Sequence, residues 1–157
     1  MTFLKNILRN TLSMGFHLML LHQLAHLSYN KLPLVGGFFS LIIKHFTQIY
    51  TGCEISPKAK IFHNVKFPHP NGIVIGEGVN IGSGVIIFQQ VTIGSKGDDS
   101  SSRSYPVICS DVKIYAKATI IGNITIGSKA IIGAHSLVTK DVASCELVAG
   151  IPAKSLK

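Results

Sequence analysis

Cysteine is scarce in this 157-residue chain, and tryptophan is absent. The three thiols, Cys53, Cys109 and Cys145, are an odd number, and no CxxC or Cys/His spacing surrounds them. This pattern argues against a disulfide framework or a zinc site, and we expect the cysteines to be small buried apolar residues. It favours a reduced compartment, so we expect the protein in the cytoplasm.

Charged residues are also few, at 14% of the chain. The formal net charge is +8, but the lysines and arginines form no basic helix and do not alternate with aromatic residues. This scatter argues against nucleic-acid binding, and we expect no nucleic-acid partner. A polyanionic cofactor or the anionic surface of a membrane explains the sign of the charge equally well.

Long uninterrupted hydrophobic runs are missing too, although 46% of the residues are apolar. Residues 1–50 hold two apolar segments, 3–29 and 38–49, separated by Pro33 and Gly36–Gly37. Their apolar residues recur at three- and four-residue steps, which predicts helices. Neither segment reaches the roughly 20 apolar residues of a spanning helix, and no signal-peptide cleavage site follows the first. Two interpretations stay open: helices that pack on each other and on a neighbouring subunit, or a peripheral contact with the inner face of the membrane.

The most regular feature of the chain is an aliphatic residue that returns every six positions between about residues 55 and 142. The clearest positions are Ile75, Ile81, Ile87, Ile93, Ile108, Ile114, Ile120, Ile126, Ile132 and Val138. A six-residue period fits neither an amphipathic helix nor an alternating strand, and is typical of a hexapeptide solenoid. We therefore expect an all-β solenoid, a parallel β-helix over residues 51–147, with three hexapeptides in each triangular coil.

Two interruptions break this period. Backwards from Ile75 it continues only if two residues are inserted near 70–73, and the polar stretch 95–106 breaks it again. A packed solenoid accepts insertions only at its corners, so we expect one bulged corner and one extruded loop at about 94–107. Because such loops commonly carry substrate contacts, the candidate substrate-binding residues are Asn71, Arg103 and Tyr105.

The bulged corner carries His69 between two prolines. The corner after the third face of one coil stacks on the corner before its first face. Glu54 is therefore expected about one strand spacing, roughly 5 Å, from His69. A carboxylate beside an imidazole fixes its tautomer and favours its protonated form, so the two residues are a candidate general-base pair. The alternative is a solvated histidine in a turn.

Further along the chain, small corner residues leave room for a ligand beside exposed backbone N–H groups. These residues are Ala116 and Gly133–Ala134, and Thr139 and Lys140 follow them. The tail 148–157 is expected to leave the solenoid and cap it. Lys140 on the solenoid and Lys154 on the tail can hold phosphates as point charges, although two solvated lysines are the alternative.

From Glu54 onwards the chain resembles the hexapeptide-repeat acyltransferases. It most resembles serine acetyltransferase and its shorter relatives from capsule and O-antigen gene clusters. The motifs that carry this resemblance are PHPNGIVIGE at 68–77, QVTIG at 90–94, IGNITIG at 121–127, VTKDV at 138–142 and AGIPAK at 149–154.

The resemblance implies a left-handed parallel β-helix with a short α-helical N-terminal segment. It also implies a homotrimer with active sites between neighbouring helices and acetyl-CoA as the donor. The absence of a metal-ligand spacing leads us to expect no metal. His69 matches the family's catalytic histidine, and Glu54 falls where the family has an aspartate. The residues that match positions along the coenzyme A groove are Ala116, Ala134, Thr139, Lys140 and Lys154.

Two departures from the family pattern concern the acceptor. Pro68 replaces the family's serine-binding aspartate, and Tyr105 replaces a second histidine at the end of the extruded loop. We therefore expect a saccharide acceptor, a sugar hydroxyl of a capsular or surface polysaccharide or of its precursor. The alternatives are a serine O-acetyltransferase of cysteine biosynthesis and a non-catalytic trimeric scaffold at the membrane.

Overall fold

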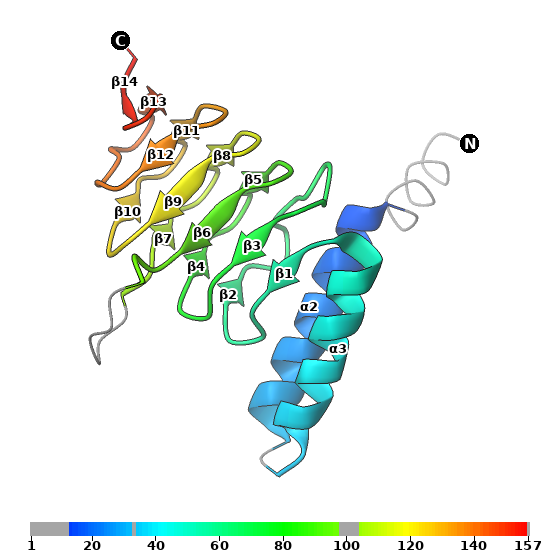
Figure 1. Cartoon of the computed structure of the whole chain (residues 1–157). Helices are drawn as coiled ribbons and strands as arrows, with labels where there is room; N and C mark the ends of the chain where they lie inside the picture. The colour runs from blue at the N-terminus through cyan, green and yellow to red at the C-terminus, as the bar shows by residue number, and fades with distance from the viewer. Residues whose placement is uncertain (1–12, 33, 98–103, 157) are drawn as a thin grey trace.

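The computed structural model describes residues 13–32, 34–97 and 104–156. Two helices, α2 (Met14–Lys31) and α3 (Gly36–Thr51), form a hairpin across one end of a column of short strands (Figure 1). The strands are β1 (Glu54–Ile55), β2 (Lys60–Ile61), β3 (Val74–Ile75), β4 (Asn80–Ile81), β5 (Ile86–Ile87), β6 (Thr92–Gly94), β7 (Val107–Ile108), β8 (Lys113–Ile114), β9 (Thr119–Ile121), β10 (Thr125–Ile126), β11 (Ile131–Ile132), β12 (Leu137–Val138), β13 (Leu147–Ala149) and β14 (Lys154–Ser155).

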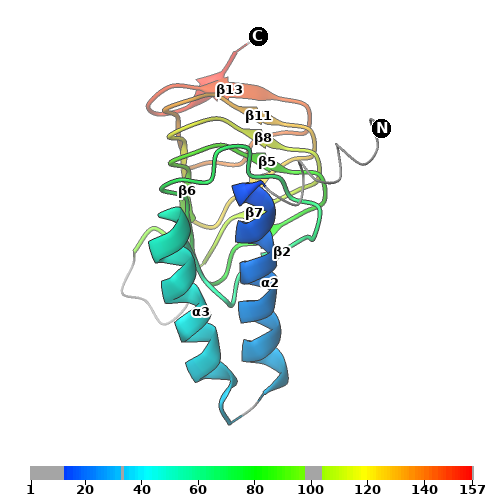
Figure 2. The same ribbon diagram turned by 90° about the vertical axis from the view of Figure 1, so that its right-hand side faces the viewer.

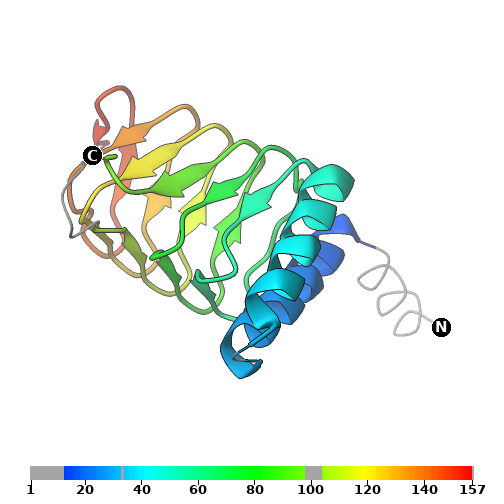
Figure 3. The same ribbon diagram turned by 60° about the horizontal axis from the view of Figure 1, so that its bottom comes forward.

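The strands build three sheets, which are the three faces of the column (Figure 3). The first sheet has the order β1-β3-β6-β9-β12, the second β2-β4-β7-β10, and the third β5-β8-β11-β13-β14. All pairs are parallel except β13 with β14, which closes the end of the column. Partners such as Val74 and Thr92 lie 18 residues apart. This register confirms the coil of three hexapeptides.

The interior of the column consists of the aliphatic residues that gave the six-residue period. In the first sheet Ile75, Ile93 and Ile120 lie above one another and are at most 1% exposed. Each burial contributes roughly 1.5–3 kcal/mol, and each coil depends on its neighbours to cover it. Leu18 and Met19 of α2 cover the first coil, so the hairpin is part of the same core.

Two edges of the column matter for function. We call the edge between the third and first sheets the His69 edge, and the edge between the first and second sheets the Tyr105 edge. Corners of the His69 edge repeat one conformation, because Gly72, Gln90, Lys117 and His135 all have φ between 57° and 63°. Hydrogen bonds between successive corners fix this turn, as from the backbone N–H of His135 to the Ala116 carbonyl at 3.0 Å.

Both predicted insertions lie at corners. Glu54 pairs with Val74, 20 residues on, and Asn80 pairs with Val107, 27 residues on. A third departure was not predicted, because Val142 bridges Ile126 only 16 residues away. The shortened corner is stabilised by Asp141, whose Oδ1 accepts the backbone N–H of Thr125 at 2.8 Å.

The helix α2 is held against the first coil by close backbone packing and by histidines. Gly15 lies so near the Phe67 carbonyl oxygen that any Cβ there would overlap it. His26 Nδ1 lies 2.7 Å from the Pro57 carbonyl oxygen. His22 is buried, its Nδ1 has no hydrogen-bond partner among the described residues, and its burial lowers its pKa to about 4.

The ends of the chain add detail to the predicted boundaries. The part of the first predicted helix before residue 13 lies outside the described residues. β13 continues the third sheet to Ala149, so the predicted tail supplies a last rung before β14 turns back. In the described ranges, no helix is long and apolar enough to cross a membrane. The three cysteines are free thiols, but only Cys53 is buried as expected. Cys109 is partly exposed, and Cys145 is exposed.

Candidate active site

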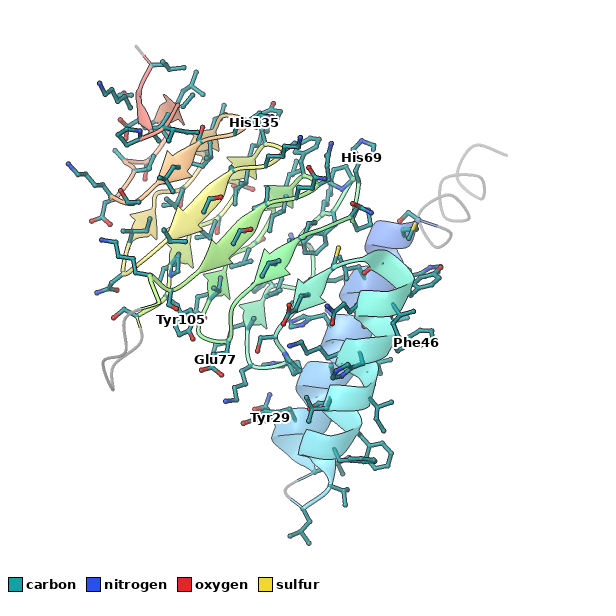
Figure 4. The ribbon with its side chains drawn as sticks, viewed as in Figure 1. Tyr29, Phe46, His69, Glu77, Tyr105 and His135 are labelled. Carbon is teal, nitrogen blue, oxygen red and sulfur yellow. The ribbon has the colours of Figure 1, made fainter. Side chains whose placement is uncertain are left out.

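His69 lies on the bulged corner between Phe67 and Ile73, exposed at the edge of the column (Figure 4). Pro70 beside it is buried and Gly72 takes up the left-handed turn, so the corner is anchored while the imidazole is free. Among the described residues the imidazole makes no hydrogen bond. Its ring instead lies 6.3 Å from the ring of Phe88 on the next coil. An imidazole placed in this way is available to a substrate.

Above His69 the His69 edge carries two stacked aromatic rings. Phe88 and Tyr115 occupy equivalent corner positions on successive coils, with centroids 5.1 Å apart and planes at 9°. The next coil has Gly133 at this position, followed by the exposed Ala134. Along this edge, the imidazole of His69 is therefore followed by two stacked aromatic rings, which we call the aromatic wall, and then by a corner with almost no side chain. Such a surface can line a narrow ligand.

The Glu54 carboxylate is engaged elsewhere. Its Oε1 lies 2.8 Å from Nζ of Lys44 on α3, with 47% of the Glu54 side chain exposed. Within the part of the chain that the structure describes, no hydrogen bond or ion pair joins Glu54 to His69. A role for Glu54 beside His69 stays a prediction.

The Tyr105 edge is built differently. The Tyr105 ring is half-buried against the core, and a Cβ on Gly76 would lie 3.0 Å from its Cε1. Its hydroxyl donates to Oε1 of Glu77 at 3.4 Å, while Oε2 of Glu77 accepts from Nζ of Lys58 at 3.0 Å. Glu77 thereby raises the pKa of Lys58. The Tyr105 phenol is thus held at the base of the extruded loop.

The other predicted site residues divide between these two edges. Asn71, Ala116 and Ala134 lie with His69, whereas Thr139 and Lys140 lie at the last corner of the Tyr105 edge. Figure 4 shows His69 and His135 on one side of the first sheet and Tyr105 and Glu77 on the other. Lys154 lies in β14, and Arg103 lies outside the described residues. A single chain therefore does not bring the predicted residues into one site.

Several charged and polar groups near the candidate residues lack a partner in the described part of the chain. Lys140 and Lys154 are exposed and form no ion pair within the described ranges. Gln89 beside Phe88 has a buried side-chain oxygen that has no hydrogen-bond partner. Among the described residues, no group of three His, Cys, Asp or Glu side chains could hold a metal ion.

Phe88, Tyr115 and Glu77 were not predicted as site residues. Glu77 lies within the motif at 68–77 but at none of the predicted site positions. The two aromatic residues are 27 positions apart because the extruded loop separates them. Their equivalence becomes visible in the sequence once that loop is removed and the corners are aligned coil by coil. Position in the coil, not residue type, is the signal that finds them.

Comparison with known proteins defines the class. Residues 105–140 match the model of the bacterial transferase hexapeptide (six repeats). Together with the parallel sheets and the neighbouring structures, this match confirms a left-handed β-helix. The chain thus resembles the hexapeptide-repeat acyltransferases in its fold and in this matched repeat.

Its relatives are serine acetyltransferases. The enzyme of Bacillus licheniformis is 39% identical over 140 residues, which are 89% of this chain and 63% of the relative. A serine acetyltransferase in complex with CoA has 34% identity and a TM-score of 0.83, covering 92% of this chain and 58% of that one. Soybean serine acetyltransferase complexed with serine has 33% identity and a TM-score of 0.86, with the same coverage of 92% and 58%.

These relatives correct the predicted acceptor. The saccharide acceptor was inferred from Pro68 and Tyr105, but the similar proteins are named for serine and not for a polysaccharide. The inference was wrong because two substituted side chains say little about an acceptor that other groups can hold. The chain spans about three fifths of the length of the relatives that it matches.

Proposed function

We propose that this protein is an acetyl-CoA-dependent acetyltransferase whose acceptor is the hydroxyl of serine. The observation that carries the proposal is the similarity to serine acetyltransferases across 89% of the chain, in a fold with a free imidazole at the bulged corner. CoA and serine are bound by two of the similar structures. The exposed lysines are suited to the phosphates of CoA, and the open corners leave room for its pantetheine arm.

The working unit in this proposal is a homotrimer with its sites between neighbouring copies. The support is the division of candidate residues between the two edges, which one copy cannot bring together. If the His69 edge of one copy faces the Tyr105 edge of the next, the imidazole, the aromatic wall and the Tyr105 hydroxyl line one cleft. A cyclic trimer repeats that heterologous contact three times and closes.

The proposed chemistry begins with proton transfer to His69. A serine hydroxyl has too high a pKa to attack a thioester unaided, so the imidazole takes its proton as the oxygen bonds to the acetyl carbonyl carbon. The tetrahedral intermediate then collapses, the carbon–sulfur bond breaks, and the imidazolium gives its proton to the departing CoA thiolate. Glu54 is proposed to stabilise the imidazolium after release from Lys44.

The donor and the acceptor are assigned to different corners. Ala116, Ala134 and Thr139 leave space for the pantetheine arm of acetyl-CoA, and Lys140 and Lys154 hold its phosphates. Asn71, Arg103 and Tyr105 are proposed to hold serine, and a guanidinium is well suited to a carboxylate. Pro68 contributes no polar group, so the acceptor depends on these three residues.

The test is release of free CoA thiol from acetyl-CoA in the presence of L-serine, followed with a thiol reagent. Serine-dependent release, together with O-acetylserine in the product, supports the proposal. D-serine and an N-acetylated sugar are the matched acceptors that should give little release. Release with the sugar alone refutes the serine acceptor, and failure to bind acetyl-CoA in calorimetry refutes the enzyme and favours a scaffold.

A further inference from the structure

The end of the helical hairpin projects past the edge of the column (Figures 1 and 2). There, α2 ends and α3 begins, on the side of the molecule away from His69 (Figure 4). We call this region the hairpin tip, and its apolar residues are Leu32, Leu34, Val35, Phe38 and Phe39. Leu34 is 96% exposed and Phe38 is 66% exposed. Large apolar side chains at a projecting end are available to something outside the chain.

Backbone hydrogen bonds hold the described residues on either side of residue 33. The N–H of Gly36 donates to the Leu32 carbonyl at 2.7 Å, and the N–H of Leu32 donates to Ser28 at 3.2 Å. Gly36 is buried against the Ser28 carbonyl oxygen, where a Cβ would overlap it. These contacts hold the turn while its large side chains point outward. The exposure is therefore a property of a defined turn.

The charge around the hairpin tip has one sign. Residues 1–53 contain four lysines and arginines and no aspartate or glutamate, whereas all seven acidic residues of the chain follow from Glu54 onwards. Lys31 lies exposed directly beside the tip. Lys44 is different, because it pairs with Glu54 at 2.8 Å. Lys31, which forms no ion pair among the described residues, thus lies beside the exposed apolar side chains of the hairpin tip.

Apolar side chains beside unpaired positive charge match an anionic lipid surface. A second hairpin is a poorer match, since two such tips would bring like charges together without an acidic partner. Spanning the bilayer is a poorer match too, because no described helix is long and apolar enough for it. We propose that the hairpin tip inserts into the headgroup region of a membrane rich in anionic lipids. This goes beyond the proposed transfer reaction and does not depend on it.

The experiment is flotation of the full chain with phosphatidylglycerol vesicles and with phosphatidylcholine vesicles. We expect binding to the anionic vesicles that weakens as salt is added. Leu34→Asp should lower the partition coefficient about tenfold. Lys31→Glu should lower it about fivefold at low salt and less at high salt.

Ile151→Asp is the matched control, because Ile151 is a 75% exposed aliphatic residue at the opposite end of the column. It should float like the wild type. Leu34→Ser is the second tip variant, and circular dichroism with Tm establishes that both tip variants are folded. Equal loss with Ile151→Asp, or no wild-type flotation, would overturn the proposal. A change in oligomer mass for Leu34→Asp without vesicle binding would instead assign the tip to a second copy.

Discussion

The two edges of the first sheet differ in what they leave free. On the His69 edge the corners are short and repeated, and the imidazole of His69 has no hydrogen-bond partner among the described residues. On the Tyr105 edge the phenol is clamped by the core and by Glu77, which also pairs with Lys58. The His69 edge presents an imidazole that can react, and the Tyr105 edge presents a side chain held in a fixed position.

This difference indicates how a rigid column can make a site. A packed β-helix cannot bend to bring two of its own edges together, because every coil is held by the coils on either side. A second copy can supply the missing edge without any movement within either chain. Each half of the site is then held by a rigid column, and the distance between the two halves depends on the contact between the copies.

The largest expected effect comes from removing the free group of the His69 edge. His69→Ala should lower turnover by about two to four orders of magnitude, the usual contribution of a positioned general base. The KM for acetyl-CoA should change little, since the lysines that hold it are untouched. Steady-state kinetics with L-serine measure both parameters.

His135→Asn is its control, because His135 lies on the same edge with φ of 57°, which asparagine also tolerates. It should keep nearly wild-type turnover. If the two variants are equally active, His69 has no part in the reaction.

Mixing two impaired variants tests whether the edges belong to one site. In a trimer that contains both His69→Ala and Tyr105→Ala chains, about one site in three joins an intact His69 edge to an intact Tyr105 edge, so activity should exceed that of either parent. Co-expression with two affinity tags isolates the mixed trimers for assay. Mixed trimers no more active than either parent would show that each site lies within one chain.

The column could be predicted well from the sequence, because its interior needs a buried aliphatic side chain at every sixth position. Residues such as Ile75 and Ile93 lie where the six-residue period placed them, and both insertions lie at corners. The shortened corner before Val142 was missed, since it depends on a hydrogen bond from Thr125 to Asp141 that no period records.

The candidate site was predicted less completely than the column. The six-residue period predicts that Glu54 and His69 are close, but it carries no information on where the helices pack. Lys44 reaches the Glu54 carboxylate from α3, which packs beside the first sheet without sharing its period. The division of the site between two edges was likewise invisible until the corners were assigned to faces.

Adding one methyl group at Gly78 should weaken the Tyr105 edge specifically. A Cβ there would overlap the Tyr105 ring, so Gly78→Ala should displace the ring and break its hydrogen bond to Glu77. We expect kcat/KM for serine to fall about tenfold, which corresponds to about 1.4 kcal/mol. Kinetics with each substrate varied in turn measure this selectivity.

Gly94→Ala is the matched control on the same edge, because an added Cβ there has no neighbouring atom within 4 Å. It should leave both KM values unchanged. An equal loss in the control would show that the effect is not transmitted through Tyr105.

Acid should destabilise the packing of α2 against the first coil. Through Pro57 and Lys58, α2 contacts the first corner of the Tyr105 edge. His22 has a folded pKa of about 4, lowered first by burial and then by His26, against 6.5 when exposed. Below pH 6.5 the unfolded chain therefore binds a proton that the folded chain does not. Stability should fall by up to about 3 kcal/mol between pH 6.5 and 4. Urea unfolding of wild type and His22→Gln measures it, and the variant should have a flatter pH dependence over this range.

The smallest expected effect concerns the ion pair that supports the same edge from outside. Lys58→Met removes the partner of Glu77 but leaves the Tyr105 hydroxyl as a donor to the other carboxylate oxygen. Both side chains are more than 40% exposed, so water and salt screen their attraction. Thermal unfolding should show a slightly lower Tm for the variant in dilute buffer and no difference in about 1 M salt, where the Debye length is about 3 Å. A difference that persists in high salt would show that Lys58 braces the edge through its packing on Tyr29, whose ring centroid lies 5.8 Å from its Nζ, and not through its charge on Glu77.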